Sequence, residues 1–518
     1  PAPSWRGSPP AASAAPPGLP DLGPAALGVP PRSAVVLLAA AEAGNAAGRP
    51  VLTLRDPFAS TDDHGRASRA GGVLPTALPA PRLDPWTILD TAAELRGAGR
   101  DLSLLALAAG VPLADGPLAG ADPAVTWAAI LAATTATDPF RGTPMDILDA
   151  LDILALWRAR AAEGGRIAAC LNIHPYKRGR LRELLASAAP PPSFHLTTRG
   201  ALAAARRRGG ALLAWSAAAP ADLSARCAAA GVELTWLEDG FIRSAGLGAA
   251  FRAGASFVLD SRGPYYDPAR ESDLEHLLAT HDFPSPLLAR AAALRAALVA
   301  RGITKYNLTG PPPALAAPPG RRRVLVPGQV EDDASVGRGG GAIRTNLALL
   351  RAVRAAEPDA FLVYKPHPDI EAGFRRGRIA AADLAGLADA VITGAPMDAV
   401  LREVDAVHTL TSLTGLEALL RGLPVTCWGA PFYAGWGLTE DRAPVPRRAR
   451  RLTLDQLVAG ALILYPRCLD PLTGLPCPPE LLIERMDRPD LFPPGRRSRL
   501  RAAQGWITRR VARWRDWR

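Results

Sequence analysis

Cysteine is scarce in this chain of 518 residues. The five cysteines are scattered, odd in number, and form neither a CxxC pair nor a Cys/His spacing that suits zinc. A disulfide framework and a structural zinc centre are therefore not expected. The sequence predicts isolated buried thiols in a reducing compartment at Cys170, Cys227, Cys427, Cys468 and Cys477.

A long apolar run is also missing. Although 48% of the residues are hydrophobic, alanine supplies much of that share. No run approaches the ~20 apolar residues that a membrane-spanning helix requires. Residues 1–31 are rich in Pro and Ala and lack the basic-then-apolar pattern of a signal peptide. We therefore expect no transmembrane segment and a cytoplasmic location.

Lysine is almost absent. Of the 60 basic residues only three are lysines, namely Lys177, Lys305 and Lys365. The net charge of +11 is therefore carried by arginine in a chain that is rich in Ala, Gly and Pro throughout. This is a bias of composition, so nucleic acid is not expected as a partner on the basis of charge alone. The same bias makes the positions of the three lysines informative.

Positive charge is concentrated only in the tail, residues 496–518, where nine arginines are interleaved with three tryptophans. Such a segment suits an anionic membrane surface, because Arg attracts lipid phosphates while Trp settles at the headgroup boundary. The alternatives are a solvated basic tail or a site for nucleic acid. We expect peripheral attachment to the inner membrane.

The organisation of the chain predicts an α/β fold. Residues 1–32 hold ten prolines and are expected to be a disordered linker, and residues 33–142 are short and irregular for a full domain. A helical pattern at 146–162 leads into 143–320, where strand-like runs at 167–171, 211–215, 234–237 and 256–259 alternate with helical stretches. After the proline-rich stretch 310–323 the alternation restarts in 321–486, with strand-like runs at 324–328, 361–365, 406–410 and 424–429. Two Rossmann-like halves separated by a linker describe the GT-B glycosyltransferase architecture, with the active site in the cleft between them. Residues 487–518 form the basic tail.

The segment TSLTGLEALLRGLPVTCWG (residues 411–429) is the most specific unit. A strand leads into small hydroxyl residues and a helix start, where backbone N–H groups and the hydroxyls of Thr411, Ser412 and Thr414 suit a phosphate. Glu417, on the first turn of the helix, could accept hydrogen bonds from ribose hydroxyls. Simple helix capping by Ser412 and Thr414 is the alternative.

The segment YKPHPD (residues 364–369) follows another predicted strand. Its two prolines would hold His367 in an extended turn at the edge where such sheets bind ligands. A single His is often structural, but its neighbour Lys365 is one of only three lysines. This placement favours a functional role.

Carboxylates follow strands in both halves. GQVEDDAS (residues 328–335) places three acids after the first strand of the second half, and WLEDGFIRS (residues 236–244) places Glu238 and Asp239 in the first half. Such acids are often solvated or capping residues. At a cleft they can instead divide the roles of nucleophile and acid/base. No DxD pattern near a strand end indicates a metal-dependent enzyme, so no metal and no cofactor are expected.

These units, together with SFVLDSRGPYYD (256–267), TKYNL (304–308) and APFYAGWGLTEDR (430–442), resemble the capsular polysaccharide β-Kdo transferase family known as KpsC. The resemblance covers residues 143–486. It implies GT-B modules, usually two in tandem, that take the acidic sugar Kdo from CMP-β-Kdo with retention. The product is a short poly-Kdo linker on a lyso-phosphatidylglycerol glycolipid at the inner membrane. Residues 143–486 are similar to the second module.

The resemblance also implies roles for single residues. By motif position, Asp333 resembles the nucleophile of a double displacement, and Glu238, with Asp239 beside it, the acid/base. Kdo's own carboxylate needs a cation such as Arg243 or Lys365. All three lysines fall in matching segments, which favours site roles. The expected contacts to the donor are His367, Lys365, Gln329, Thr411, Ser412, Thr414, Glu417 and Arg243.

The sequence departs from the family pattern in places. Pro264 and Ser216 stand where small apolar residues and Gly are expected. Upstream, LRDPFAST (54–61) is similar to a decayed copy of LEDGFIRS, and residues 127–145 echo the module ending at 461–477. Residues 33–142 are thus interpreted as a degenerate, inactive remnant of a preceding module.

The predicted function is a metal-independent, retaining β-Kdo glycosyltransferase of capsule biosynthesis. Its expected partners are CMP-Kdo, a Kdo-primed glycolipid acceptor and proteins of capsule assembly and export. The alternative is a non-catalytic scaffold of a capsule assembly complex that only binds a nucleotide sugar.

Overall fold

The computed structural model describes residues 34–38, 51–54, 89 and 92–492, apart from 117, 188, 244–253, 306, 308–309, 373–374 and 376. The predicted linker 1–32, the copy 54–61 beyond Leu54, and the tail 496–518 lie outside these residues. The chain divides into two compact units, Pro1–Ala159 and Arg160–Arg518. This boundary between the units falls inside helix α5 (Ile147–Gly165), whereas the domain boundary predicted from the sequence lies at 142/143. Helix α5 covers the helical pattern predicted before Arg166.

The first unit contains a parallel sheet of three strands in the order β2-β1-β3. Its strands are β1 (Ala34–Leu38), β2 (Val51–Leu54) and β3 (Ala92–Arg96), followed by helices α3 (Arg100–Ala109) and α4 (Pro123–Ala133). A parallel sheet fits the interpretation of a partial α/β module. Whether it is an inactive remnant stays a prediction.

The predicted echo between residues 127–145 and 461–477 has a counterpart in local structure. Strands β4 (Ala136–Thr137) and β5 (Pro144–Met145) pair antiparallel, as do β17 (Pro466–Leu469) and β18 (Pro476–Cys477). In both hairpins a DPxxG turn places an aspartate carbonyl 2.8 Å from the glycine N–H, at Asp138–Gly142 and Asp470–Gly474. Both glycines have positive φ, 70° and 74°. The two segments therefore fold alike.

The first half of the second unit is built on a seven-stranded sheet in the order β18-β17-β10-β9-β8-β6-β7. Strands β6 to β9 run parallel. Their bounds are β6 (Ile167–Leu171), β7 (Ser193–His195), β8 (Ala211–Trp215) and β9 (Leu234–Asp239), with β10 (Ser256–Asp260) after them. The intervening helices are α6 (Arg178–Leu184), α7 (Thr198–Arg208) and α8 (Leu223–Ala230), with short 3-10 turns η2 (Pro175–Lys177) and η3 (Ser216–Ala218).

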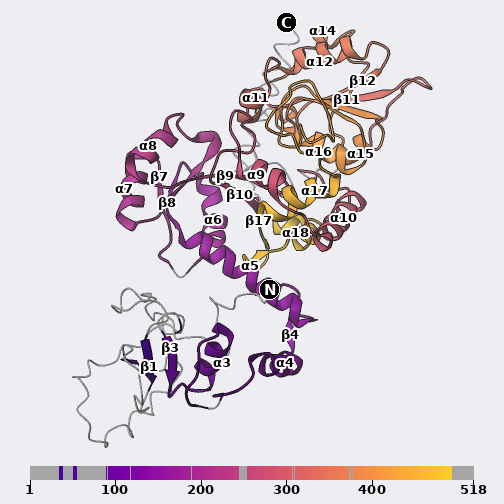
Figure 1. Ribbon diagram of the computed structural model, residues 1–518. Coiled ribbons are helices and arrows are strands. Elements are labelled where there is room, and N and C mark those ends of the chain that lie inside the picture. The colour runs from indigo at the N-terminus through magenta and orange to yellow at the C-terminus, as the bar shows by residue number, and fades with distance from the viewer. Residues whose placement is uncertain are drawn as a thin grey trace, which may run out of the picture. The chain divides into compact units, whose positions relative to one another are not determined.

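Successive side chains of these buried strands point to opposite faces of the sheet, and each face is covered by helices. One set of side chains, including Cys170 and Leu213, packs with α6, while the alternate set, including Leu171 and Leu212, packs with α7 and α8. Figure 1 shows α7 and α8 together beside β7 and β8. A strand with helices on both faces must be apolar on both sides, which is why these runs are continuous rather than alternating in sequence.

The predicted strand at 256–259 exists, but the expectation of a parallel sheet is wrong for it. Strand β10 runs antiparallel to β9 and to β17. An apolar run indicates burial and says nothing about strand direction. Through β17 and β18, the segment predicted as the donor half, 321–486, also returns to the sheet of the first half.

The second half has a six-stranded parallel sheet in the order β13-β12-β11-β14-β15-β16. Its strands are β11 (Arg323–Pro327), β12 (Phe361–Lys365), β13 (Ala390–Val391), β14 (Ala406–Thr409), β15 (Val425–Cys427) and β16 (Glu440–Asp441). Its helices are α11 (Ala334–Gly339), α12 (Asn346–Ala356), α13 (Pro368–Glu371), α14 (Ala381–Leu384), α15 (Met397–Leu401) and α16 (Leu413–Leu420). Helix α12 covers the sheet with Leu349, Leu350 and Val353. The proline-rich stretch 310–322 contains neither helix nor strand, as predicted.

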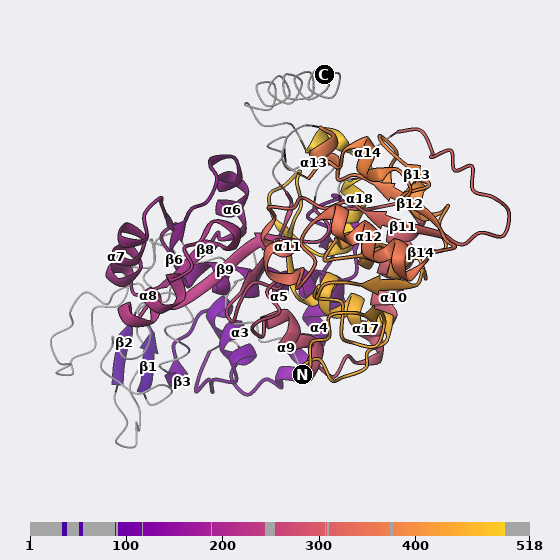
Figure 2. The same cartoon turned by 90° about the horizontal axis from the view of Figure 1, so that it is seen from above.

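The remaining helices are α9 (Asp273–Thr280), α10 (Ser285–Ala300), α17 (Leu454–Val458), a π-helical turn η5 (Ala459–Leu464), α18 (Pro479–Arg485) and a 3-10 turn η6 (Pro489–Leu491). Ion pairs connect these segments, among them Arg295–Asp455 at 2.9 Å and Arg290–Glu480 at 2.7 Å. Viewed from above, β9 of the first half points toward α11 of the second (Figure 2).

All five cysteines are buried free thiols, as predicted. In the part of the chain that the structure describes, no helix is both long and apolar enough to cross a membrane.

Candidate functional site

A cleft of about 370 Å³ lies within the second unit and is lined by residues of both halves. This volume is in the range of small-molecule sites, roughly 300–1,000 Å³. Every residue predicted for the site lines it: Glu238, Asp239, Arg243, Gln329, Asp333, Lys365, His367, Thr411, Ser412, Thr414 and Glu417. The fold therefore brings all the candidates together, while their individual roles remain predictions.

The cleft lies where the strand order of the second sheet reverses. Strand β11 is paired with β12 on one side and β14 on the other, and ligands bind at such switch points beyond the carboxyl ends of the strands. There the Gln329 amide nitrogen donates to Thr411 Oγ1 at 2.9 Å, and its oxygen accepts from the Thr411 backbone N–H at 2.9 Å. Gln329 thus joins the ends of β11 and β14, while its predicted contact with the donor stays a prediction.

Ser412 is the N-cap of α16. Its hydroxyl accepts from the Thr414 backbone N–H at 3.2 Å, so the capping interpretation is confirmed for Ser412. Capping does not remove Ser412 and Thr414 from the cleft, which both residues line. Glu417 accepts a hydrogen bond from the Lys305 backbone N–H at 2.7 Å. Burial raises the pKa of Glu417, while that N–H opposes the rise.

His367 is held as a neutral imidazole. Burial, followed by the charge of Lys305, lowers its pKa to about 3. Its Nδ1 accepts from the Asp369 backbone N–H at 3.1 Å, which in a neutral ring assigns the proton to Nε2. Lys365, 2% exposed, lies 3.9 Å from Glu371, and burial lowers its pKa. The YKPHPD turn therefore supplies one neutral donor and one cation.

The structure distinguishes among the three consecutive acids of the second half. The Glu331 carboxylate accepts from the Asn346 backbone N–H at 2.8 Å, and Asp332 pairs with Arg375 at 3.1 Å. Of the three, Asp333 lines the cleft. It is exposed and caps α11 through one oxygen, Oδ1, which accepts from the Ser335 N–H and hydroxyl at 2.9 and 2.8 Å.

In the first half, Asp239 is placed between two cations. Its Oδ1 accepts from Lys177 Nζ at 2.7 Å, and its Oδ2 lies 2.8 Å from Arg243 Nε. The Lys177 ammonium also lies 3.6 Å from the centroid of the Trp215 ring, a cation–π contact. Burial would raise the pKa of Asp239, but Arg243 and Lys177 lower it overall. Asp239 therefore holds two cations at the cleft and is poorly placed to move a proton itself.

Glu238 has the opposite environment although it is the next residue. Burial and then the charge of Asp239 raise its pKa to about 7, while Lys177 and a hydrogen bond from Ser216 oppose the rise. The Ser216 hydroxyl donates to Glu238 Oε2 at 2.7 Å. A carboxyl with a pKa near neutrality can exchange protons at physiological pH, as an acid/base must.

All three lysines of the chain line the cleft. The prediction of site roles for them thus gains support from their convergence. Trp215 and Tyr266, which also line it, were not predicted. Trp215 ends β8 at the switch point of the first sheet, where β6 pairs with β7 and β8, and that position is the signal that could have identified it.

No group of His, Cys, Asp and Glu side chains within the described ranges is arranged to hold a metal ion. The charged groups at the cleft are instead cations and carboxylates of the chain. Metal independence itself stays a prediction.

Two α/β halves, with a polar cleft at the switch points of their sheets, define this protein as one with the GT-B glycosyltransferase fold. Comparison with known proteins specifies it further. The sequence profile described as "Capsule polysaccharide biosynthesis protein" matches residues 310–467. Two solved chains of Thermosulfurimonas dismutans KpsC are similar: the beta Kdo 2,7 transferase, with 34% identity and a TM-score of 0.52, and the beta Kdo 2,4 transferase, with 30% and 0.55. Each match covers 62% of this chain and 98% of the other.

Curated relatives match over a shorter share of their length. The capsule polysaccharide modification protein LipA of Neisseria meningitidis serogroup A is 47% identical over 242 residues, which are 47% of this chain and 34% of LipA. The lipopolysaccharide-processing protein LpsZ of Rhizobium meliloti is 44% identical over 239 residues, 46% of this chain and 54% of LpsZ. The match thus spans about a third of LipA and about half of LpsZ. The chain belongs to the KpsC-like family of capsule polysaccharide proteins.

Proposed function

We propose that the second unit is a retaining β-Kdo transferase that uses CMP-Kdo in capsule biosynthesis. The observation that carries this proposal is that Asp333 and Glu238, carboxylates from opposite halves, line one cleft together with cations and hydroxyl groups at the switch points. Two carboxylates facing a sugar from different sides can divide the work of a double displacement. The similar T. dismutans chains, named as Kdo transferases, support the choice of sugar.

The donor nucleotide is assigned to the second half. The start of α16, with Ser412 and Thr414, offers N–H groups and hydroxyls to the phosphate. His367 would donate from Nε2, and Lys305 and Lys365 would offset the charge of the phosphate and the Kdo carboxylate. Glu417 would accept from the ribose hydroxyls.

The chemistry divides into two displacements. Asp333 attacks the anomeric carbon of Kdo, and the bond to the phosphate oxygen breaks as CMP leaves with the electron pair. In the second step an acceptor hydroxyl attacks the same carbon, its proton passes to Glu238, and the bond to Asp333 breaks. Two inversions give net retention. Asp333 caps α11 through Oδ1 alone, so Oδ2 is assigned as the attacking atom.

The acceptor proposed is a Kdo-primed (lyso)phosphatidylglycerol glycolipid at the inner membrane, with the basic tail as the contact to lipid. The acceptor and the contact of the tail with lipid are both proposed from the resemblance to the KpsC family.

The test is transfer from CMP-Kdo to a Kdo-primed glycolipid, followed by mass spectrometry, with the anomeric configuration and linkage read by NMR. Asp333→Ala should lower kcat by on the order of 10³-fold or more. The matched control is Asp332→Ala, one residue away and paired with Arg375, which should keep most of the activity. Equal activity in Asp333→Ala would remove the nucleophile assignment. CMP binding without turnover on any acceptor would favour the non-catalytic scaffold instead.

A further inference from the structure

Hydrogen bonds connect Glu238 to two buried hydroxyl groups that have no part in the two displacements proposed above. Ser216, 2% exposed, donates to Glu238 Oε2 at 2.7 Å. Tyr266, 6% exposed, donates in turn to Ser216 Oγ at 3.0 Å. The three side chains come from different elements: β9, the turn η3 that follows β8, and the loop between β10 and α9. Ser216 and Tyr266 thus form a defined chain of donors that ends on one carboxylate oxygen.

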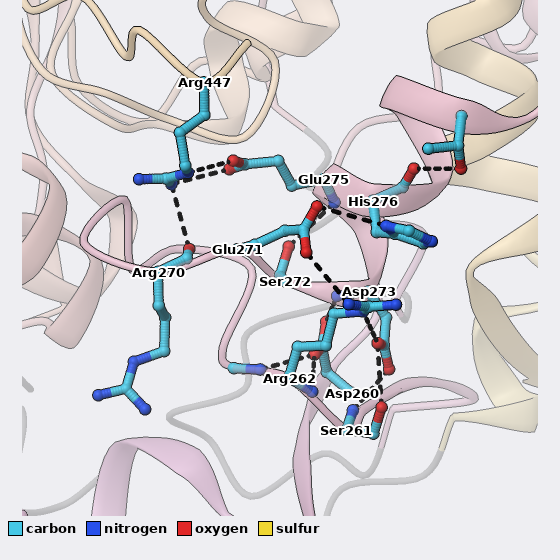
Figure 3. A network of polar contacts seen from close by, with 12 residues as sticks. Asp260, Ser261, Arg262, Arg270, Glu271, Ser272, Asp273, Glu275, His276 and Arg447 are labelled. Atoms are coloured by element: carbon cyan, nitrogen blue, oxygen red, sulfur yellow. Dashed lines mark hydrogen bonds and ion pairs between the residues drawn. The ribbon is translucent and has the colours of Figure 1, made fainter.

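The loop that carries Tyr266 is held at both ends. Asp260, at the end of β10, accepts from the backbone N–H groups of Gly263 and Asp273, each at 2.8 Å. Tyr465 donates to the same carboxylate at 2.8 Å. Figure 3 shows Asp260 beside Ser261, Arg262 and Asp273 and, nearby, Arg447 reaching Glu275 at the start of α9, at 2.7 Å. The loop segments on either side of Tyr266 are therefore anchored by hydrogen bonds.

We infer that Ser216 and Tyr266 are positioning residues that orient Glu238 and keep it ionisable, so that it can take the proton of the acceptor hydroxyl. The inference rests on the proposed function, since it concerns the second displacement. There the acceptor O–H bond breaks, the proton goes to Glu238, the new bond to the anomeric carbon forms, and the bond to Asp333 breaks. Ser216 donates its own proton toward Oε2 and so favours the carboxylate over the acid.

The groups around Glu238 explain why such a donor is needed. Asp239 on the same strand repels a second negative charge. The charge of Glu238 in turn contributes to raising the pKa of Tyr265, Tyr266 and Tyr176. Lys177, on η2, is attractive but already engaged by Asp239. Among the described residues, Ser216 supplies the side-chain hydrogen bond to Glu238. Without it, burial and Asp239 would shift the carboxyl toward its protonated form, which cannot act as a base.

A purely structural role would also leave Ser216 hydrogen-bonded, so the test must follow the titration of Glu238. In each background the melting temperature is measured against pH for the protein with Glu238 and for its Glu238→Gln variant. The pH at which the difference between the two curves is half complete is the midpoint, and it reports the titration of Glu238 without substrate. It is measured in the wild-type, Ser216→Ala and Tyr266→Phe backgrounds of the full chain. The pH profile of kcat/KM for transfer is measured in parallel, and Ser216→Thr, which keeps the hydroxyl, serves as the rescue variant.

We expect Ser216→Ala to raise both midpoints by about half to one pH unit, the effect of one hydrogen bond to a carboxylate. Tyr266→Phe should shift them in the same direction by less, because Tyr266 acts on Glu238 only through Ser216. Ser216→Thr should restore the wild-type midpoint. Unchanged midpoints in both Ser216→Ala and Tyr266→Phe would overturn the positioning role of these two residues while leaving the proposed function intact. Failure of the wild-type protein to transfer Kdo would instead overturn the proposed function, and with it the base role.

Discussion

The Lys177 ammonium donates to Asp239 Oδ1 at 2.7 Å, with the lysine 3% exposed and the aspartate 17%. Removing one partner of such a pair leaves an uncompensated charge in a poorly solvated place. Because Asp239 also contacts Arg243, it balances two cations at once. Lys177 and Arg243 would repel each other without it.

Asp239→Asn should therefore lower the free energy of unfolding by about 3 kcal/mol. The pKa of Asp239 is lowered in the folded state, so its contribution is present above the ordinary value of 3.8 and is lost as pH falls through the folded pKa. Chemical denaturation at pH 7 measures the effect. Asp222→Asn, whose carboxylate lies 3.9 Å from Arg226 with both side chains exposed, is the control and should change stability by less than about 0.5 kcal/mol. Equal small effects in the two variants would contradict the bridging role.

Glu238 should make both stability and activity depend on pH. Its folded pKa of about 7 exceeds its ordinary value of 4.5, so the folded state binds the proton more tightly. The free energy of unfolding should then fall as pH rises from 4.5 to about 7 and level off above, a change on the order of 3 kcal/mol. Glu238→Gln should lack this decline in melting experiments. For transfer, kcat/KM should rise with pH through about 7, as expected of a base, and a profile without that limb would argue against the assignment.

His367 should bind the donor as a neutral group. Its pKa of about 3 means that it carries no charge in the folded state at pH 6 to 8. His367→Ala should weaken CMP binding by about tenfold, the loss of one hydrogen bond to a charged group, with the same factor at pH 6 and pH 8. Calorimetry checks this, with His276→Ala, which lies outside the cleft, as the control. A loss confined to pH 6 would indicate a charged histidine.

The same pKa has a consequence for stability. Between about 3 and 6.5 the unfolded chain binds the His367 proton and the folded protein does not, so this residue makes stability rise with pH over that range. The His367→Ala variant should lose less stability on acidification than the wild type does.

Gly415 should be intolerant of any side chain. A Cβ at this position in α16 would lie 2.7 Å from Cζ of Tyr433, a residue that is fully buried and donates to the Ser412 carbonyl. Gly415→Ala should cost about 1–3 kcal/mol through overpacking, and it should weaken CMP binding by moving the start of α16. Gly337→Ala, in α11, meets no heavy atom within 4 Å and is the control. It should be neutral or stabilising by about 0.5–1 kcal/mol.

Much of the fold follows from local pattern. The strands at 167–171, 211–215 and 361–365 have the predicted bounds, because each is a short apolar run bounded by turn residues. The direction of β10 and the return of β17 and β18 to the first sheet were not predictable in this way. They depend on which distant segments pair, and a single strand carries no mark of its partner.

The candidate site, like the fold, could be predicted only in part. Motifs that follow parallel strands must meet at one edge of a sheet, so the convergence of His367, Asp333 and Ser412 could be predicted from their positions after predicted strands. The connection of Ser216 and Tyr266 to Glu238 could not be predicted. Tyr266 and Ser216 are 50 residues apart, and the contact between them depends on how the loop 261–272 is anchored.

By itself, then, the sequence determined the α/β class, the family, and the strand ends that line the cleft, because periodicity and motif spacing are local properties. The tertiary structure decided the electrostatic state of each group. Glu238 and Asp239 are adjacent carboxylates, yet their pKa values shift in opposite directions. The reason is that Asp239 is placed between Lys177 and Arg243, whereas Glu238 lies half-buried beside Asp239 and accepts a hydrogen bond from the Ser216 hydroxyl.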